Sequence, residues 1–147
     1  MVFLREADKN DRDLLFKWAN DPVVRSNSFN TAPIPYENHV KWFNKMMDDS
    51  TVLQFILMDD DTPVGQIRLN VDGEEAGIGY SIGSEFRGKG HGLLILKLVK
   101  EEVKQNYPEI RRLVAKVKPG NVASNKIFQI ANYNMECLFY SLTISDD

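Results

Sequence analysis

The segment from Arg87 to Gly92 alternates glycines with basic side chains. The glycines are Gly88, Gly90 and Gly92, and the basic residues are Arg87, Lys89 and His91. An apolar strand pattern precedes this glycine turn and an apolar helix pattern follows it. The first turn of a helix offers unpaired N–H groups and the positive end of the helix dipole, and glycine lets an anion come close. The glycine turn therefore predicts an anion-binding site with basic residues at its rim.

The spacing of the turn excludes two common phosphate-binding motifs. A Walker-type loop places Ser or Thr directly after its lysine, whereas Gly90 follows Lys89 here. The dinucleotide fingerprint needs a glycine where Leu93 stands. These departures disfavour ATP and NAD as the bound anion. A structural alternative stays open, in which the glycines only supply positive φ to a tight strand-to-helix connection.

The strand that leads into the turn is nearly bare on one face, because side chains alternate along a strand. One face carries Ala76, Ile78, Tyr80 and Ile82, and the bare face carries Gly77, Gly79, Ser81 and Gly83. Repeated glycine in a strand interior indicates that a ligand or another backbone comes close to the sheet. Two interpretations follow: a helix that crowds the bare face, or a slender ligand that lies along it with its phosphates at the glycine turn.

A slender amide-bearing arm attached to a pyrophosphate describes coenzyme A, and the motifs resemble those of the GCN5-related N-acetyltransferases (GNAT). The acetyl-CoA signature of that family reads Q/R-x-x-G-x-G/A, which matches Arg87 to Gly92. Downstream, Asn121 and Ser124 match the family's N-x-x-S/A motif at the start of a helix. Asn132 replaces the usual glycine at the end of that helix, and asparagine also enters the left-handed conformation that a helix end needs.

The resemblance implies an α/β, more narrowly α+β, GNAT fold with a mixed, mostly antiparallel sheet of about six to seven strands flanked by about four helices. The residue patterns themselves predict strands at 2–7, 51–58, 63–71, 75–82 and 110–118, terminal strand material at 133–144, and helices at 14–19, 36–47, 93–103 and 121–131. The final strand, helix, strand order predicts parallel pairing. With 147 residues, a single domain over 1–147 is expected.

The resemblance also implies which residues hold acetyl-CoA. Backbone groups around Ser81 and Ile82 hold the pantetheine arm and polarise the thioester carbonyl. The N–H groups of residues 87–92 bind the pyrophosphate, and Asn121 bonds the arm from the far side. Acetyl then passes directly to a bound amine, without a covalent enzyme intermediate.

The departing thiolate needs a proton, and many relatives supply it from a tyrosine at the position of Phe128, which cannot donate. Ser124 is the expected donor by its place in the motif, and a hydroxyl that only bonds its own helix is the alternative. The amine must also lose a proton, because an alkyl ammonium titrates near about 10.4. Glu75, beside Glu74 at the start of the bare strand, is the expected base, and an exposed turn carboxylate is the alternative.

The segment from Trp18 to Phe43 resembles acetyltransferases that act on nucleotide-linked amino sugars of nonulosonic (pseudaminic) acid pathways. A hydroxyl, an amide, an imidazole and an aromatic face in this segment suit a sugar or a nucleobase. The expected acceptor residues are Ser28, Asn30, His39 and Trp42. As an alternative, His39 and Trp42 close the edge of the core.

Two further functions stay open. One is acetylation of a protein or peptide N-terminus, as in ribosomal-protein acetyltransferases. The other is a non-catalytic acyl-CoA-binding module, which Phe128 and the missing carboxylate at Gly77 favour.

The resemblance implies acetyl-CoA and a small-molecule amine as partners, and composition disfavours several others. A formal net charge of -3 disfavours nucleic acid and anionic membrane surfaces, and no apolar run approaches the about 20 residues that span a bilayer. The two histidines and the single Cys137 lack metal-ligand spacing, so no metal is expected. The lone cysteine and the charged start of the chain favour a cytoplasmic protein. Exposed edge strands would allow a homodimer.

Overall fold

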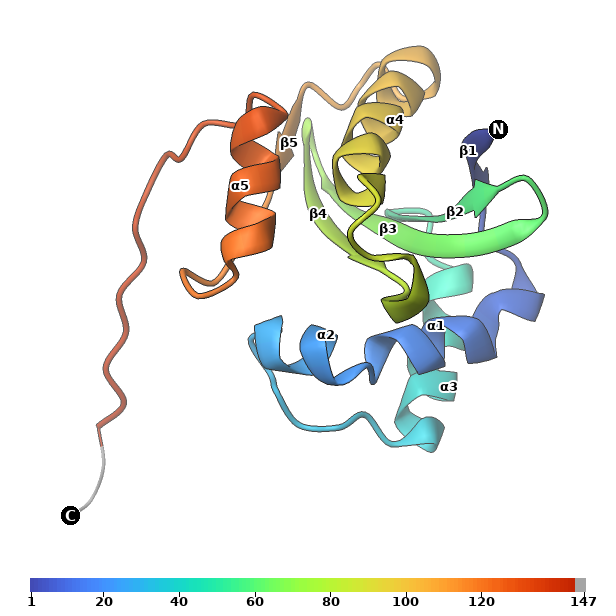
Figure 1. Cartoon of the computed structure of the whole chain (residues 1–147), viewed down its shortest axis with the longest axis horizontal. Coiled ribbons are helices and arrows are strands. Elements are labelled where there is room, and N and C mark those ends of the chain that lie inside the picture. The colour runs from blue at the N-terminus through green and yellow to red at the C-terminus, as the bar shows by residue number, and fades with distance from the viewer. Residues whose placement is uncertain (145–147) are drawn as a thin grey trace.

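A mixed five-stranded sheet organises the structure, a computed structural model that describes residues 1–144 (Figure 1). Its strands are β1 (Val2–Glu6), β2 (Val52–Asp59), β3 (Thr62–Asp72), β4 (Glu75–Ile82) and β5 (Arg112–Val114), in the order β1-β2-β3-β4-β5. The first four strands pair antiparallel, and β5 pairs parallel with β4. Tight turns join β2 to β3 and β3 to β4, whereas the parallel pair needs a helical crossover.

Helices cover both faces of this sheet. They are α1 (Arg12–Ala19), α2 (Pro22–Asn27), α3 (Tyr36–Met47), α4 (His91–Asn106) and α5 (Val122–Ile130), with short 3-10 turns η1 (Lys9–Asp11) and η2 (Ser84–Phe86). α4 lies on one face, α1 and α3 lie on the other, and α5 stands beside β5 (Figure 1). Within residues 1–144, no helix is both long and apolar enough to cross a membrane.

Each face of the sheet buries its own apolar cluster, because β2 is apolar on both faces. Phe55 and Leu57 pack in one cluster with Ile95 of α4. Ile56 points the other way and packs with Trp18 of α1. Burying one such side chain contributes about 1.5–3 kcal/mol. A strand covered on both sides holds the neighbouring β3 and β4 in a fixed position, and β4 carries the candidate site.

The Asp21-Pro22 pair ends α1 as predicted, but it also starts α2, a helix that the sequence pattern does not predict. The Asp21 carboxylate accepts hydrogen bonds from the N–H groups of Val23 at 2.9 Å and Val24 at 3.3 Å. Pro22 occupies the first helical position, where its missing N–H costs nothing. The two residues therefore redirect the chain, and α2 becomes a wall beside β4.

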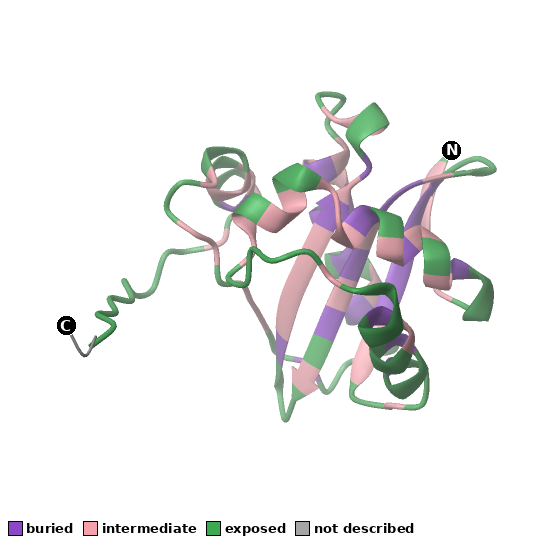
Figure 2. Cartoon of the chain, turned by 90° about the horizontal axis from the view of Figure 1, so that it is seen from below, coloured by how far each residue is buried: buried purple, intermediate pink, exposed green. Residues whose placement is uncertain are grey.

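The predicted α/β class with a mixed, mostly antiparallel sheet is confirmed, but the sheet has five strands rather than six to seven. Residues 133–144, predicted as strand, have no regular secondary structure, and they are exposed from Asn134 to Ile144 (Figure 2). The predicted parallel pairing at this end of the chain is correspondingly wrong, and the parallel pair is β4 with β5. Apolar composition favours a strand only where a neighbouring strand completes the ladder.

Candidate active site

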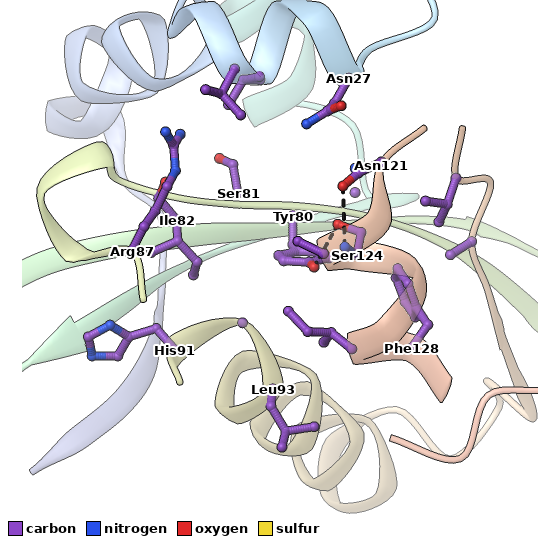
Figure 3. A pocket seen from close by; sticks show the side chains of 18 of the residues that line it. Asn27, Tyr80, Ser81, Ile82, Arg87, His91, Leu93, Asn121, Ser124 and Phe128 are labelled. Atoms are coloured by element: carbon purple, nitrogen blue, oxygen red, sulfur yellow. Dashed lines mark hydrogen bonds between the residues drawn. The ribbon is translucent and has the colours of Figure 1, made fainter. Parts of the chain in front are cut away.

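A cleft of about 500 Å³ opens beside β4. α2 closes one side, the glycine turn and the start of α4 close a second side, and α5 closes a third (Figure 3). Residues 115–117, which follow β5, line the edge across from β4. The cleft therefore lies where the bare strand meets the glycine turn.

The cleft exists because β4 and β5 stop pairing early. Their parallel register joins only Glu75–Gly77 to Arg112–Val114, although β4 continues to Ile82 in register with β3. The predicted strand 110–118 is accordingly cut to three residues. Beyond Gly77 the two chains separate, and the cleft occupies the space between them.

The free edge of β4 presents backbone hydrogen-bonding groups to this space. In an antiparallel strand, the N–H and C=O of one residue point to the same neighbour. Gly83 donates to the Val64 carbonyl on the β3 side at 2.8 Å. By this alternation, Ile78, Tyr80 and Ile82 turn their backbone groups away from β3 and toward the cleft. Ser81 turns its backbone toward β3.

The bare face is open at Gly77 and Gly79 and crowded only at Gly83. A Cβ at Gly77 or Gly79 would approach no protein atom closer than 4.0 Å. A Cβ at Gly83 would lie 3.0 Å from Nε1 of Trp18, so that glycine is needed for packing. The two interpretations of the bare face thus apply to different residues. Helix packing accounts for Gly83, and open space beside the cleft accounts for Gly79.

The glycine turn has the left-handed backbone that its composition predicts. φ is +77° at Gly88 and +85° at Gly90, a region that other residues enter only with strain. α4 begins at His91 with no side chain that caps its first turn. The first helical hydrogen bond runs from the Leu94 N–H to the Gly90 carbonyl at 3.2 Å. The N–H groups of residues 91–93 therefore have no helical partner, and these residues line the cleft.

Gly92 serves a different purpose from the other two glycines of the turn. A Cβ there would stand 2.9 Å from Cδ1 of Ile127 and 3.7 Å from the Tyr80 ring. Its missing side chain lets α4 approach α5 and β4 closely. Gly92 therefore narrows the end of the cleft where Tyr80 lies.

The three basic side chains of the turn have separate environments. Arg87 points toward α2 (Figure 3), where its Nε donates to the Ile82 carbonyl at 3.2 Å and its Nη2 pairs with Asp21 at 3.0 Å. His91 Nδ1 lies 3.1 Å from a backbone carbonyl of η2. Lys89 is exposed and does not line the cleft. An anion in the cleft would therefore meet mainly the backbone of the turn, and less its basic side chains.

The Asp21–Arg87 ion pair joins α2 to the glycine turn. Burial pulls the pKa of Asp21 upward, but the hydrogen bonds from Arg87, Val24 and Val23 outweigh it and hold the pKa below its ordinary value. Asp21 is therefore ionised at neutral pH. The pair is lost only as pH falls through this lowered pKa.

α5 brings Asn121 and Ser124 into the cleft. The Asn121 Oδ1 accepts a hydrogen bond from the Ser124 N–H at 3.2 Å and so caps the helix. The Ser124 hydroxyl lies 2.9 Å from the hydroxyl of Tyr80 (Figure 3). Phe128 packs edge-on against the Tyr80 ring, with centroids 5.8 Å apart. The phenol of Tyr80 on β4 therefore lies beside Phe128, whose ring carries no hydroxyl.

Tyr80 is a functional candidate that the sequence pattern does not reveal. Strand alternation places it only on the apolar face, and its contact with Ser124 joins residues far apart in the chain. Burial raises the pKa of Tyr80, and the hydrogen bond with Ser124 offsets only part of the rise. The phenol is therefore protonated at neutral pH and able to donate.

Glu75, the expected base, lies outside the cleft. Its carboxylate pairs with Nε of Arg112 at 3.6 Å, and half of its side chain is exposed. An extended strand from Glu75 to Ser81 spans about 20 Å. The structure therefore favours the alternative, an exposed carboxylate at a strand end.

The expected acceptor residues do not gather in one place. Ser28 lines the cleft, and its hydroxyl donates to the Val24 carbonyl at 2.6 Å. Asn30 is exposed and outside the cleft lining, and its Oδ1 accepts from the Ala32 N–H at 3.1 Å. Asn27, which the sequence pattern does not single out, lines the cleft instead. α2, more than the loop after it, faces the cleft.

His39 belongs to the core. Its side chain is buried at 3 % exposure, its Nε2 lies 2.7 Å from the Arg12 carbonyl, and its ring packs against Phe16 and Phe43. A substrate has no access to this ring, which corrects its assignment to acceptor binding. Trp42 remains 37 % exposed. Among residues 1–144, no three His, Cys, Asp or Glu side chains gather as metal ligands would.

The solved structures that share this fold include two acetyltransferases bound to coenzyme A. The spermidine N-acetyltransferase of Vibrio cholerae, in complex with CoA and spermine, aligns with a TM-score of 0.81 at 18% identity, over 92% of this chain and 82% of that one. An aminoglycoside acetyltransferase in complex with coenzyme A and kanamycin aligns with a TM-score of 0.79 at 18% identity, over 92% of this chain and 86% of that one. At these identities the likeness shows the fold alone.

Sequence comparisons go further than the fold. The acetyltransferase PseH of Campylobacter jejuni is 28% identical over an alignment 128 residues long, which covers 84% of this chain and 77% of the relative. The family model described as an acetyltransferase (GNAT) domain matches residues 2–132, from the first strand to the end of α5. Because that match includes the glycine turn and both motif residues of α5, the chain belongs to the GNAT family of acetyltransferases.

Proposed function

We propose that this protein is an acetyl-CoA-dependent N-acetyltransferase whose acceptor is the primary amine of a nucleotide-linked amino sugar. The cleft carries the proposal: unpartnered N–H groups at the start of α4 and the free edge of β4 line one space of about 500 Å³. Such a space suits a thin molecule with amides along its arm and a diphosphate at its end. The family match, and the coenzyme bound in both solved relatives, support acetyl-CoA as the donor.

Different parts of the cleft suit different parts of the donor. The backbone of Gly88 and Gly90, with the N–H groups of His91 and Gly92, suits the pyrophosphate. The backbone of Ile78, Tyr80 and Ile82 suits the amide-bearing arm, because these residues face the cleft. The Ile82 N–H is the group best placed by strand alternation to polarise the thioester carbonyl. Asn121 presents its side-chain amide from the α5 side.

The reaction forms a C–N bond, breaks a C–S bond and moves two protons. The hydroxyls of Ser124 and Tyr80, 2.9 Å apart, form the pair that returns a proton to the sulfur. Ser124 donates to the thiolate while Tyr80 donates to Ser124, and solvent then reprotonates the phenol. The amine loses its proton to water, because Glu75 lies outside the cleft.

A small amine as acceptor has two supports. Both solved relatives hold small amines, spermine and kanamycin. The resemblance of residues 18–43 to acetyltransferases of nucleotide-linked amino sugars narrows the choice to that class. α2 and its neighbours, which carry this resemblance, form the wall of the cleft nearest the bare face.

A panel of amines tests the enzyme and its acceptor together. We expect thiol release from acetyl-CoA to be fastest with an amino sugar linked to a nucleoside diphosphate, and slower by about tenfold or more with peptide N-termini or polyamines, because each missing contact costs about 1 kcal/mol. Thiol production is followed with a chromogenic disulfide reagent. Tight acetyl-CoA binding without thiol release for any amine would instead mark an acyl-CoA-binding module.

Gly90→Asp tests the donor site. We expect acetyl-CoA affinity to fall about 100-fold or more, because a carboxylate beside the unpaired amides of α4 repels the pyrophosphate. Gly73→Asp is the matched control, since Gly73 also has positive φ, at +63°, and lies in open space away from the cleft. Calorimetry measures the affinity of both variants. Equal affinities in the two would reject the assignment of the glycine turn.

Ser124→Ala and Tyr80→Phe test the proton donors. We expect Ser124→Ala to lower kcat about 10²- to 10⁴-fold and to leave the acetyl-CoA Kd unchanged, because the hydroxyl acts on the leaving thiolate. Tyr80→Phe keeps the ring packing, and a loss of about tenfold is expected from the missing hydrogen bond. Ser26→Ala, which removes a hydroxyl outside the cleft lining, is the control. If both cleft variants retain the wild-type kcat, the proton must come from elsewhere.

A further inference from the structure

The guanidinium of Arg68 lies on the same face of the sheet as the bare face of β4. It lies in the middle of β3, directly opposite Gln54 on β2 and Gly79 on β4. Cross-strand partners share one face of a sheet, so the Arg68 side chain projects onto the same face as Gly79. Its Nη2 stands 4.0 Å from the place where a Cβ of Gly79 would be. Gly79 lines the cleft, whereas Arg68 and Trp42 do not, so the Arg68 guanidinium lies just behind the lining, next to Gly79.

This guanidinium has no partner in the part of the chain that the structure describes. Arg5, Arg87 and Arg112 each pair with a carboxylate, whereas Arg68 makes no ion pair and no hydrogen bond among residues 1–144. Burial lowers the pKa of Arg68, and no neighbouring acid opposes the shift. The Arg68 side chain is partly exposed, so its N–H groups face solvent and are free to make charge-assisted hydrogen bonds to a bound anion.

Trp42 holds the guanidinium in place. The Cζ atom of Arg68 lies 5.0 Å from the centroid of the Trp42 ring, a cation–π contact. Stacking uses the flat face of a guanidinium and leaves its N–H edges available to an oxyanion. Trp42 is partly exposed, so the pair stands at the rim of the core. Among residues 1–144, the N–H groups of the stacked guanidinium have no acceptor, which leaves them available to a ligand.

Among the described residues, the cleft lining next to Arg68 contains no Asp or Glu that would neutralise it. α2 contributes Val24 and Asn27 to the cleft, and neither carries a charge. The carboxylate of Asp21 is already paired with Arg87 at 3.0 Å. Lys116, across the cleft, adds a further cation to the lining. The acceptor side of the cleft is therefore suited to an anionic molecule.

We infer that Arg68 selects the acceptor by binding an anionic group that the acceptor carries beside its amine, namely the diphosphate of a nucleotide-linked amino sugar. Trp42 positions the guanidinium, and Gly79 leaves room above it. The same charge repels polycationic amines. This inference rests on the proposed function, since it names the group that distinguishes one class of amine from others.

The test compares two acceptors that share one amine: an amino sugar linked to uridine diphosphate, and the same amino sugar free. Arg68→Gln is expected to raise KM for the linked sugar about 10- to 100-fold, because hydrogen bonds to a charged group are lost. KM for the free sugar, kcat and the acetyl-CoA Kd are expected to stay within about twofold, since no contact is lost there. Arg68→Lys should recover part of the affinity. Equal changes of KM for both acceptors, or none, would overturn the inference.

Arg112→Gln is the control, because it removes the same charge at the strand end where β5 pairs with Glu75, away from Gly79. It should leave both KM values unchanged.

Binding of uridine diphosphate alone, measured by calorimetry with coenzyme A present, distinguishes failure of the anion site at Arg68 from failure of the proposed function. If the wild type acetylates neither sugar, the proposed function fails. Loss of uridine diphosphate binding in Arg68→Gln would still support an anion site at Arg68. Equal binding in wild type and variant, or none in the wild type, would reject the site itself.

Discussion

The early end of pairing between β4 and β5 is the constraint on which the rest of the site depends. Pairing with β5 stops at Gly77, whereas β3 holds β4 as far as Ile82. One edge of β4 is therefore fixed and the other is left with backbone groups that need partners. A ligand that carries amides can continue the ladder where β5 leaves it, in the manner of an added strand. The cleft thus occupies the position that a further stretch of paired strand would take.

Contacts around the free edge of β4 bring the candidate functional side chains close to it. The Asp21–Arg87 pair joins α2 to the glycine turn, so two walls of the cleft are connected by an ion pair at 3.0 Å. Gly92 allows α4 to come close to Tyr80, whose hydroxyl meets Ser124. The two apolar clusters, one on each face of the sheet, fix β3 and β4 and therefore the cleft wall.

Features that depend on a few neighbouring residues were predictable from sequence. The positive φ of Gly88 and Gly90 and the bare face of β4 follow from local composition. Features that depend on distant partners were not. Tyr80 lies beside Ser124 only in the folded chain, and Glu75, the expected base, pairs with Arg112 outside the cleft lining.

Contacts with distant parts of the chain also explain the other differences between the predictions and the structure. His39 carries the chemistry of a substrate ligand, but Phe16 and Phe43 enclose it. Residues 133–144 have the composition of a strand, but the sheet ends at β5 and offers them no ladder. Arg68 has no unusual sequence context, and only the strand register places it beside Gly79.

A titration of ¹⁵N-labelled protein with acetyl-CoA tests directly whether the free edge of β4 and the start of α4 bind the donor. The backbone amide signals of Ile82, His91 and Gly92 should shift most and saturate together. Saturable shifts that leave these three amides unchanged would contradict this binding site.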